Sequence, residues 1–119
     1  MEYKRLCESD YRFMCMIWEN EPVNSTELVR LCKEKFGWQK STTYTMVKKM
    51  SEKGLARSEN ALVSALVPRE MVEKLESDHF VRETFSGSLP GFLVAFLGGK
   101  KLTHEEAEEL KQLIEAHEE

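Results

Sequence analysis

Hydrogen-bond donors are concentrated in one stretch of the chain, between Trp38 and Gly54. On a helix that begins near Ser41, the hydroxyl groups of Ser41 and Thr45 and the ammonium group of Lys48 lie on one face. Because such groups contact phosphate oxygens and base edges, the stretch predicts a helix that lies in the major groove of DNA. The alternative is an ordinary amphipathic helix with a solvated polar face. The candidate DNA contacts are Lys40, Ser41, Thr42, Thr43, Tyr44, Thr45, Lys48, Lys49 and Arg57.

The other face of this expected helix is apolar. A buried stripe at the spacing i, i+3, i+4 and i+7 is formed by Thr43, Met46, Val47 and Met50. Thr43 therefore belongs both to the buried stripe and to the candidate DNA contacts.

The charge of the chain is distributed unevenly. Residues 1–67 carry a net charge of +2 and residues 68–119 carry −6, which together give the formal charge of −4. The segment from Trp38 to Arg57 holds five lysine and arginine residues against Glu52 alone. Because phosphate binding responds to the local field more than to net charge, this basic segment is compatible with DNA binding.

Two helices are expected before the candidate reading helix. The first lies within residues 1–20 and ends before Pro22, which disfavours helix in the preceding residue. Its apolar stripe consists of Tyr11, Met14, Cys15 and Trp18, joined by Phe13 and Ile17. The second, Ser25–Phe36, follows a capping-box pattern in which Asn24 is the N-cap and Glu27 returns a hydrogen bond.

The third helix, Ser41–Lys53, is followed by a change to strand periodicity. Residues 55–58 and 61–67 indicate two short strands joined by a tight turn at Glu59-Asn60. Three helices and a hairpin in this order predict a mainly α, winged helix-turn-helix domain. The hairpin would bring Arg57 towards a phosphate; alternatively, it only covers an open edge of the core.

The second half of the chain is expected to be helical and to form a dimer. Helices are predicted over residues 68–85 and 89–97 and from a capping box at Thr103 to His117. Three helices in about 50 residues bury their aromatic residues poorly, so we expect a homodimer, with folding back onto the N-terminal core as the alternative. Residues 1–67 are thus the DNA-binding domain and residues 68–119 the helical dimerisation domain. The expected dimer interface comprises Met71, Leu75, Phe80, Phe85, Leu89, Phe92, Leu93, Phe96, Leu97, Leu110 and Ile114.

Several classes of protein are disfavoured by what the sequence lacks. There is no glycine-rich phosphate loop or GxSxG motif, and the histidines lie at no metal-ligand spacing, so neither an enzyme nor a metal or cofactor site is expected. The cysteines form no CxxC pair and are expected to be small core residues; they are Cys7, Cys15 and Cys32. No apolar run is long enough to span a membrane and no signal peptide is recognised, so no membrane insertion and a cytoplasmic location are expected.

A series of short motifs covers nearly the whole chain. They are Leu6 to Trp18, Pro22 to Val29, Trp38 with Thr42, Thr45, Lys49, Lys53 and Gly54, Leu66-Val67, Arg69-Glu70, Gly87-Ser88-Leu89 with Phe92 to Leu97, and Leu102-Thr103 with Glu105-Glu106. In this order they resemble the penicillinase-repressor (BlaI/MecI-type) family of winged-helix transcriptional regulators.

The resemblance implies a homodimeric, sequence-specific transcriptional repressor of resistance-type genes that binds a palindromic DNA operator. It also implies a sensor protease as a partner, which in the family responds to a β-lactam and cuts the helix matching residues 89–97. The matching bond here is Ala95-Phe96, whereas the family has Asn-Phe, and this departure weighs against cleavage. The short hairpin departs from the family's basic, aromatic wing and implies weaker wing contacts or a different operator.

Two alternatives compete with this interpretation. A copper-responsive branch of the family ends in paired cysteines, but this chain has no cysteine after Cys32, so copper binding is not expected. The competing function is a winged-helix protein-interaction module without sequence-specific DNA binding, which the acidic and apolar C-terminal half favours.

Overall fold

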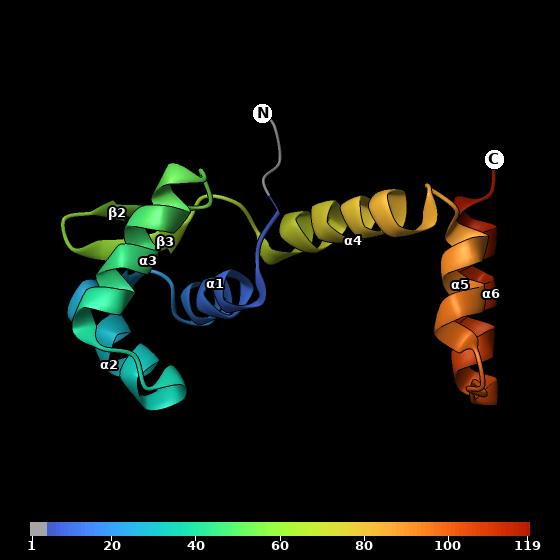
Figure 1. Ribbon diagram of the computed structural model, residues 1–119, viewed down its shortest axis with the longest axis horizontal. Coiled ribbons are helices and arrows are strands. Elements are labelled where there is room, and N and C mark those ends of the chain that lie inside the picture. The colour runs from blue at the N-terminus through green and yellow to red at the C-terminus, as the bar shows by residue number, and fades with distance from the viewer. Residues whose placement is uncertain (1–4) are drawn as a thin grey trace. The chain divides into compact units, whose positions relative to one another are not determined.

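The computed structural model describes residues 5–119, which form six α-helices and a small antiparallel sheet (Figure 1). The elements are α1 (Glu8–Asn20), β1 (Val23–Asn24), α2 (Ser25–Phe36), α3 (Lys40–Glu52), β2 (Ala56–Glu59), β3 (Leu62–Ala65), α4 (Arg69–Phe85), α5 (Leu89–Leu97) and α6 (His104–His117). Three helices followed by a hairpin confirm the predicted winged helix. The predicted limits of α2 and α5 are confirmed to the residue, while α3 begins and ends one residue earlier than expected.

The chain divides into two compact units, one ending at Phe80 and the other spanning Val81–Glu119. The boundary expected after Val67 lies just before α4, and the first part of α4 belongs to the first unit. The reason is Val72, which is completely buried in the core of that unit. The division of DNA binding and dimerisation between residues 1–67 and 68–119 stays a prediction.

The core of the first unit lies between the three helices and the sheet. Its completely buried apolar side chains include Phe13, Met14, Ile17, Leu28, Met50 and Val63. The apolar face expected for α1 is confirmed at Phe13, Met14 and Ile17, which are completely buried, whereas Cys15 is only half-buried. Tyr11 and Trp18 lie half-buried beside that face, with their rings 5.9 Å apart. A helix packed on two sides buries more than one narrow stripe, and this explains the difference.

The sheet has the strand order β1-β3-β2, with both pairs antiparallel. The hairpin turn lies at Asn60-Ala61, one residue later than expected, because Glu59 pairs with Leu62. Asn60 and Ala61 both have left-handed backbone angles, φ 54° and 64°, as a two-residue type I′ turn requires. β1 was not predicted, since two residues are too few to show a strand period.

The helix ends follow local capping rules, with one exception. Asn24 accepts a hydrogen bond from the Thr26 amide at 2.9 Å, which confirms it as the N-cap of α2. The return bond expected from Glu27 is absent from the described residues, because Glu27 pairs instead with Arg30 one turn along the helix. The second capping box, between Thr103 and Glu106, is confirmed in both directions.

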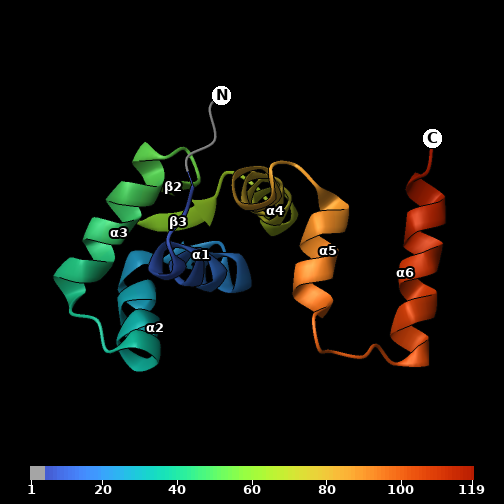
Figure 2. The same ribbon diagram turned by 45° about the vertical axis from the view of Figure 1, so that its right-hand side comes forward.

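The second unit contains the helices α5 and α6, which run in opposite directions (Figure 2). Neither helix contains a buried residue. Their exposed apolar side chains include Leu89, Val94, Phe96, Leu113 and Ile114. Within residues 5–119, no helix combines the length and the apolar character needed to cross a membrane.

The cysteines differ from the expectation of three core residues. Cys32 is buried, but Cys15 is half-buried and Cys7 is exposed at the start of α1. All three are free thiols. Cys7 precedes the first helical residue, so no helical stripe carries it into the core.

Candidate nucleic-acid interface

Two sets of contacts fix the orientation of α3: the packing of its buried residues and the aromatic contacts of the turn that precedes it. The buried residues of α3 are Thr43, Met46, Val47 and Met50, as their spacing predicts. Before the helix, the Trp38 ring stacks on Phe13 of α1, with 5.9 Å between centroids, and lies 4.7 Å from the Phe36 ring. These contacts join α1, the end of α2 and the start of α3.

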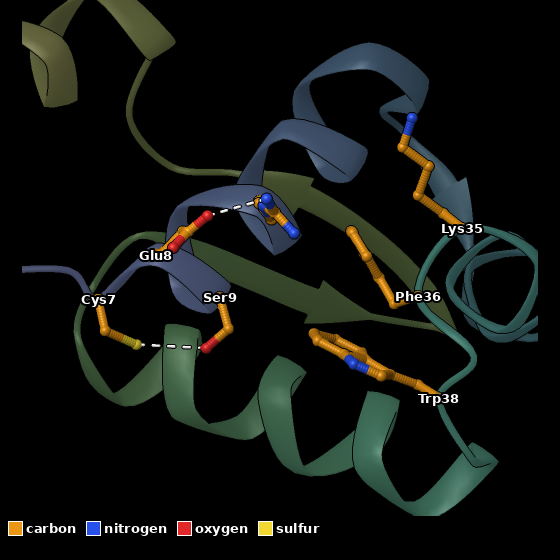
Figure 3. Close-up of a pocket in the computed structure, with 7 residues that line it drawn as sticks. Cys7, Glu8, Ser9, Lys35, Phe36 and Trp38 are labelled. Atoms are coloured by element: carbon orange, nitrogen blue, oxygen red, sulfur yellow. Dashed lines mark hydrogen bonds and ion pairs between the residues drawn. The ribbon is translucent and has the colours of Figure 1, made fainter.

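Phe36 and Trp38 also line a cavity of about 600 Å³ next to the first turn of α1 (Figure 3). Its polar groups interact with one another: the Cys7 Sγ lies 3.3 Å from the Ser9 Oγ, and Glu8 pairs with Arg12 at 2.8 Å. None of the candidate DNA contacts lines this cavity. It is therefore separate from the expected interface.

The side of α3 away from the core carries the expected polar face. Its exposed residues are Lys40, Ser41, Thr42, Tyr44, Thr45 and Lys48, and the exposed Lys49 lies at its edge, next to α1. The Lys40 Nζ lies 5.7 Å from the centroid of the Tyr44 ring, which is a cation–π distance. Among residues 5–119, neither Lys40 nor Lys48 forms an ion pair, so both ammonium groups remain available to an anionic partner.

Thr43 cannot belong to this face. Only 1% of its surface is exposed, and its buried hydroxyl has no nitrogen or oxygen partner in the described structure. The expectation that Thr43 contacts DNA is therefore wrong. The physical reason is its spacing: Thr43 lies three residues before Met46 and seven before Met50, so it belongs to the buried side of α3.

Replacing Thr43 with valine should raise the free energy of unfolding by about 1 kcal/mol, because an unsatisfied buried hydroxyl costs about 1–3 kcal/mol and valine has nearly the same shape. Affinity for DNA should be unchanged. Urea unfolding and a DNA titration measure the two quantities. Thr45→Val is the matched control, expected to weaken DNA binding without the gain in stability. Equal losses of DNA affinity in both variants would restore Thr43 as a contact.

Lys49 and Lys53 interact with a buried carboxylate. The Lys49 Nζ donates to one oxygen of Asp10 at 2.9 Å, and the Lys53 Nζ donates to the other at 3.1 Å. Burial by itself raises the pKa of the Asp10 carboxyl, but hydrogen bonds from Lys49, Lys53 and the Cys7 thiol outweigh burial and hold the pKa below its usual value. Asp10 is thus a carboxylate at neutral pH, and Lys49 has a partner inside the protein.

The wing is the hairpin formed by β2 and β3, and the positive charge of its arginine is partly neutralised. Arg57 on β2 is exposed, but its guanidinium forms an ion pair with Glu59 at 2.6 Å. The turn beyond it is anchored, because the Ser25 amide donates to the Ala61 carbonyl at 2.8 Å. Arg57 is therefore placed on the wing as expected, with a carboxylate competing for its charge.

Sequence reasoning missed both carboxylates. Glu59 could have been found, because residues i and i+2 of a strand lie on the same face, which places it beside Arg57. Asp10 left no such signal, since it lies 39 and 43 residues from its two lysine partners.

The profile of the penicillinase repressor family matches residues 6–116, almost the entire chain. The chain belongs to this family. The match includes α3, the β2–β3 hairpin, α4, α5 and all but the last residue of α6.

Relatives in the penicillinase repressor family have similar lengths. The penicillinase repressor of Bacillus licheniformis is 25% identical over 118 residues, covering 95% of this chain and 91% of that protein. The methicillin resistance regulatory protein MecI of Staphylococcus aureus is 19% identical over 113 residues, covering 92% of each.

A solved structure shares the fold. The solution structure of monomeric B. licheniformis BlaI, in complex with the blaP half-operator, matches with a TM-score of 0.50 and 16% identity. The match covers 58% of this chain and 89% of that one. It supports the winged-helix architecture of the penicillinase repressor family in this chain.

The candidate dimer residues of this family member are spread over both units. Phe85, Phe92 and Phe96 form a row of ring contacts, with centroids 5.5 and 5.7 Å apart. The exposed members are Met71, Phe80, Leu89, Phe96, Leu110 and Ile114, and the half-buried ones are Leu75, Phe85, Phe92, Leu93 and Leu97. Ala95 and Phe96, the candidate cleavage pair, are both exposed near the end of α5.

Proposed function

We propose that the protein is a sequence-specific DNA-binding repressor of transcription, with α3 in the major groove of its operator. The observation that carries the proposal is the exposed face of α3. There, hydroxyl groups lie beside the ammonium groups of Lys40 and Lys48, which have no ion pair within residues 5–119. Phosphate contacts position such a helix, and its hydroxyl groups reach the base edges.

The names of the relatives support the same proposal. One is a penicillinase repressor, another regulates methicillin resistance, and BlaI has been solved on a half-operator. We therefore infer that the regulated genes are of the resistance type. The function requires no catalytic step, and it places the protein in the cytoplasm with its operator.

The exposed apolar side chains of α5 and α6 support a homodimer. Side chains such as Phe96 and Ile114 are more than half exposed in the single chain, and large apolar patches of this kind mark interfaces. A two-fold dimer presents two reading helices, which suits a palindromic operator.

A sensor protease is proposed as a partner from family membership alone. The candidate bond is Ala95-Phe96, whose two residues are exposed on α5. Alanine stands where the family resemblance implies asparagine, so a protease that requires asparagine would leave this chain intact. Incubation with such a protease and mass measurement of the products tests the bond.

The double substitution of Lys40 and Lys48 with alanine should weaken operator binding by about tenfold or more, because hydrogen bonds to charged groups contribute about 1.5–3 kcal/mol. The slope of log K against log salt should also become shallower by about 0.9 for each phosphate that the variant no longer neutralises. Fluorescence titrations of labelled operator at several salt concentrations measure both quantities.

Lys111→Ala is the matched control for charge, since Lys111 lies on α6 and pairs with Glu108 at 3.3 Å. Its affinity and slope should equal those of the wild type. If the wild-type protein is not retained on duplex DNA even at low salt, the protein-interaction module becomes the better explanation.

A further inference from the structure

Asp10 is a charged residue placed in the core of a DNA-binding unit. It lies in the first turn of α1, and only 1% of its surface is exposed. Its two oxygens accept hydrogen bonds from Lys49 and Lys53, both near the end of α3. A buried carboxylate is costly unless it is paired and hydrogen-bonded, and here both oxygens are satisfied.

The two lysines differ from their neighbour Lys48 in position and not in chemistry. Lys49 and Lys53 are four residues apart, so they lie on the same side of α3, which faces α1. Lys53 is only 18% exposed and its Nζ also lies 3.4 Å from the Arg5 carbonyl. Lys48, the residue before Lys49, lies on the exposed face of α3 and forms no ion pair in the described structure.

We propose that Asp10 is a positioning residue for operator recognition, which fixes the rotation of α3 and withholds Lys49 and Lys53 from DNA phosphates. The inference rests on the proposed function. Contacts to base edges require a reading helix held to within about 0.5 Å, and phosphate contacts by mobile lysines carry no sequence information. Asp10 thus favours specific over nonspecific binding.

The physical basis is a two-point attachment. The α3 helix is fixed near its start by the Trp38 ring stack and near its end by Asp10. Without Asp10, the C-terminal half of α3 loses its charged contact with α1, and two ammonium groups become free to follow the phosphate backbone. The affinity for nonspecific DNA should then rise, and the ratio of operator affinity to nonspecific affinity should fall.

Lys48→Gln and Lys49→Gln provide the first test, since the change is identical at adjacent positions. In Lys48→Gln the salt slope of operator binding should fall by about 0.9 per protomer. In Lys49→Gln the slope should change by less than half of that amount, while the ratio of operator to nonspecific affinity falls several-fold. An equal fall in slope for both variants would overturn the proposal.

Asp10→Asn in the full chain provides the second test. The slope for nonspecific duplex DNA should become steeper by up to about 1.8 per protomer, for two added phosphate contacts. The ratio of operator to nonspecific affinity should fall by about tenfold, the effect of about one mismatched base pair. If Asp10 only stabilises the fold, both affinities fall by the same factor and the slopes stay constant, which would overturn the proposal.

Glu8→Gln is the control for charge. Glu8 lies in the same turn of α1 and pairs with Arg12 of its own helix at 2.8 Å, so slope and ratio should match the wild type. If Asp10→Asn does not fold, the comparison of Lys48 with Lys49 still decides the question. Absence of DNA binding by the wild-type protein at low salt would reject the proposed function itself, which is a different outcome.

Discussion

Ile114→Glu should convert the proposed homodimer into a monomer and raise its dissociation constant by about 1,000-fold or more. Burying an unpaired carboxylate costs several kcal/mol, and two-fold symmetry places two of them, one from each subunit, in the single interface. Each 1.4 kcal/mol corresponds to about tenfold in affinity, so a total near 4 kcal/mol gives this factor. Ile114 is suited to the test because 59% of its surface is exposed in the single chain.

Operator binding should weaken together with dimerisation. Two linked reading helices bind two half-sites with a high effective concentration, which a monomer lacks. We therefore expect a loss of at least about 100-fold on the full palindrome and little change on a half-operator. Sedimentation velocity and titrations with both duplexes measure these effects.

Gln112→Glu is the matched control for Ile114→Glu. Gln112 lies on the same helix, on the face away from the apolar stripe, and it is exposed. The Gln112→Glu substitution adds the same negative charge as Ile114→Glu, and this variant should remain dimeric. A dimer that persists in Ile114→Glu would place the interface outside α6. Substitution is preferred to truncation after Val67, because truncation would remove Val72 from the core.

Phe13→Ala should lower the free energy of unfolding by about 3–5 kcal/mol, since a large cavity would replace a completely buried ring. This is a large share of the 5–15 kcal/mol that stabilises a typical domain. The ring also stacks on Trp38, so its removal takes away a contact that orients the start of α3. Weaker operator binding should follow even under conditions where the variant is folded.

Urea unfolding followed by tryptophan fluorescence measures this effect, because both tryptophans, Trp18 and Trp38, lie in the first unit. Phe36→Ala is the control: it also removes a phenyl ring that contacts Trp38, but Phe36 is only half-buried. Its loss of stability should be clearly smaller. Equal losses in the two variants would show that burial of Phe13 is not what stabilises the unit.

Much of α3 could be predicted from its own residues. The stripe Met46, Val47 and Met50 is buried as its spacing indicates, and the polar face opposite it is exposed. The same holds for the Thr103 cap of α6 and the position of α5. Thr43 shows the limit of this reasoning, because residue type suggested a DNA contact while residue spacing placed it in the core.

The sequence by itself determined the order of the helices and the hairpin, the limits of α2 to α6 to within about one residue, and the face that α3 presents. These features depend on residues within about one or two helical turns, whose periodicity and caps can be read along the chain. Tertiary structure alone decided that Asp10 and Met16 of α1 are also buried, where β1 pairs, and that Val72 joins the first unit. It also decided that Lys49 and Lys53 turn inward to Asp10 while Lys48 does not. The reason is distance along the chain: partners about 40 residues apart share no local period, and only packing brings them together.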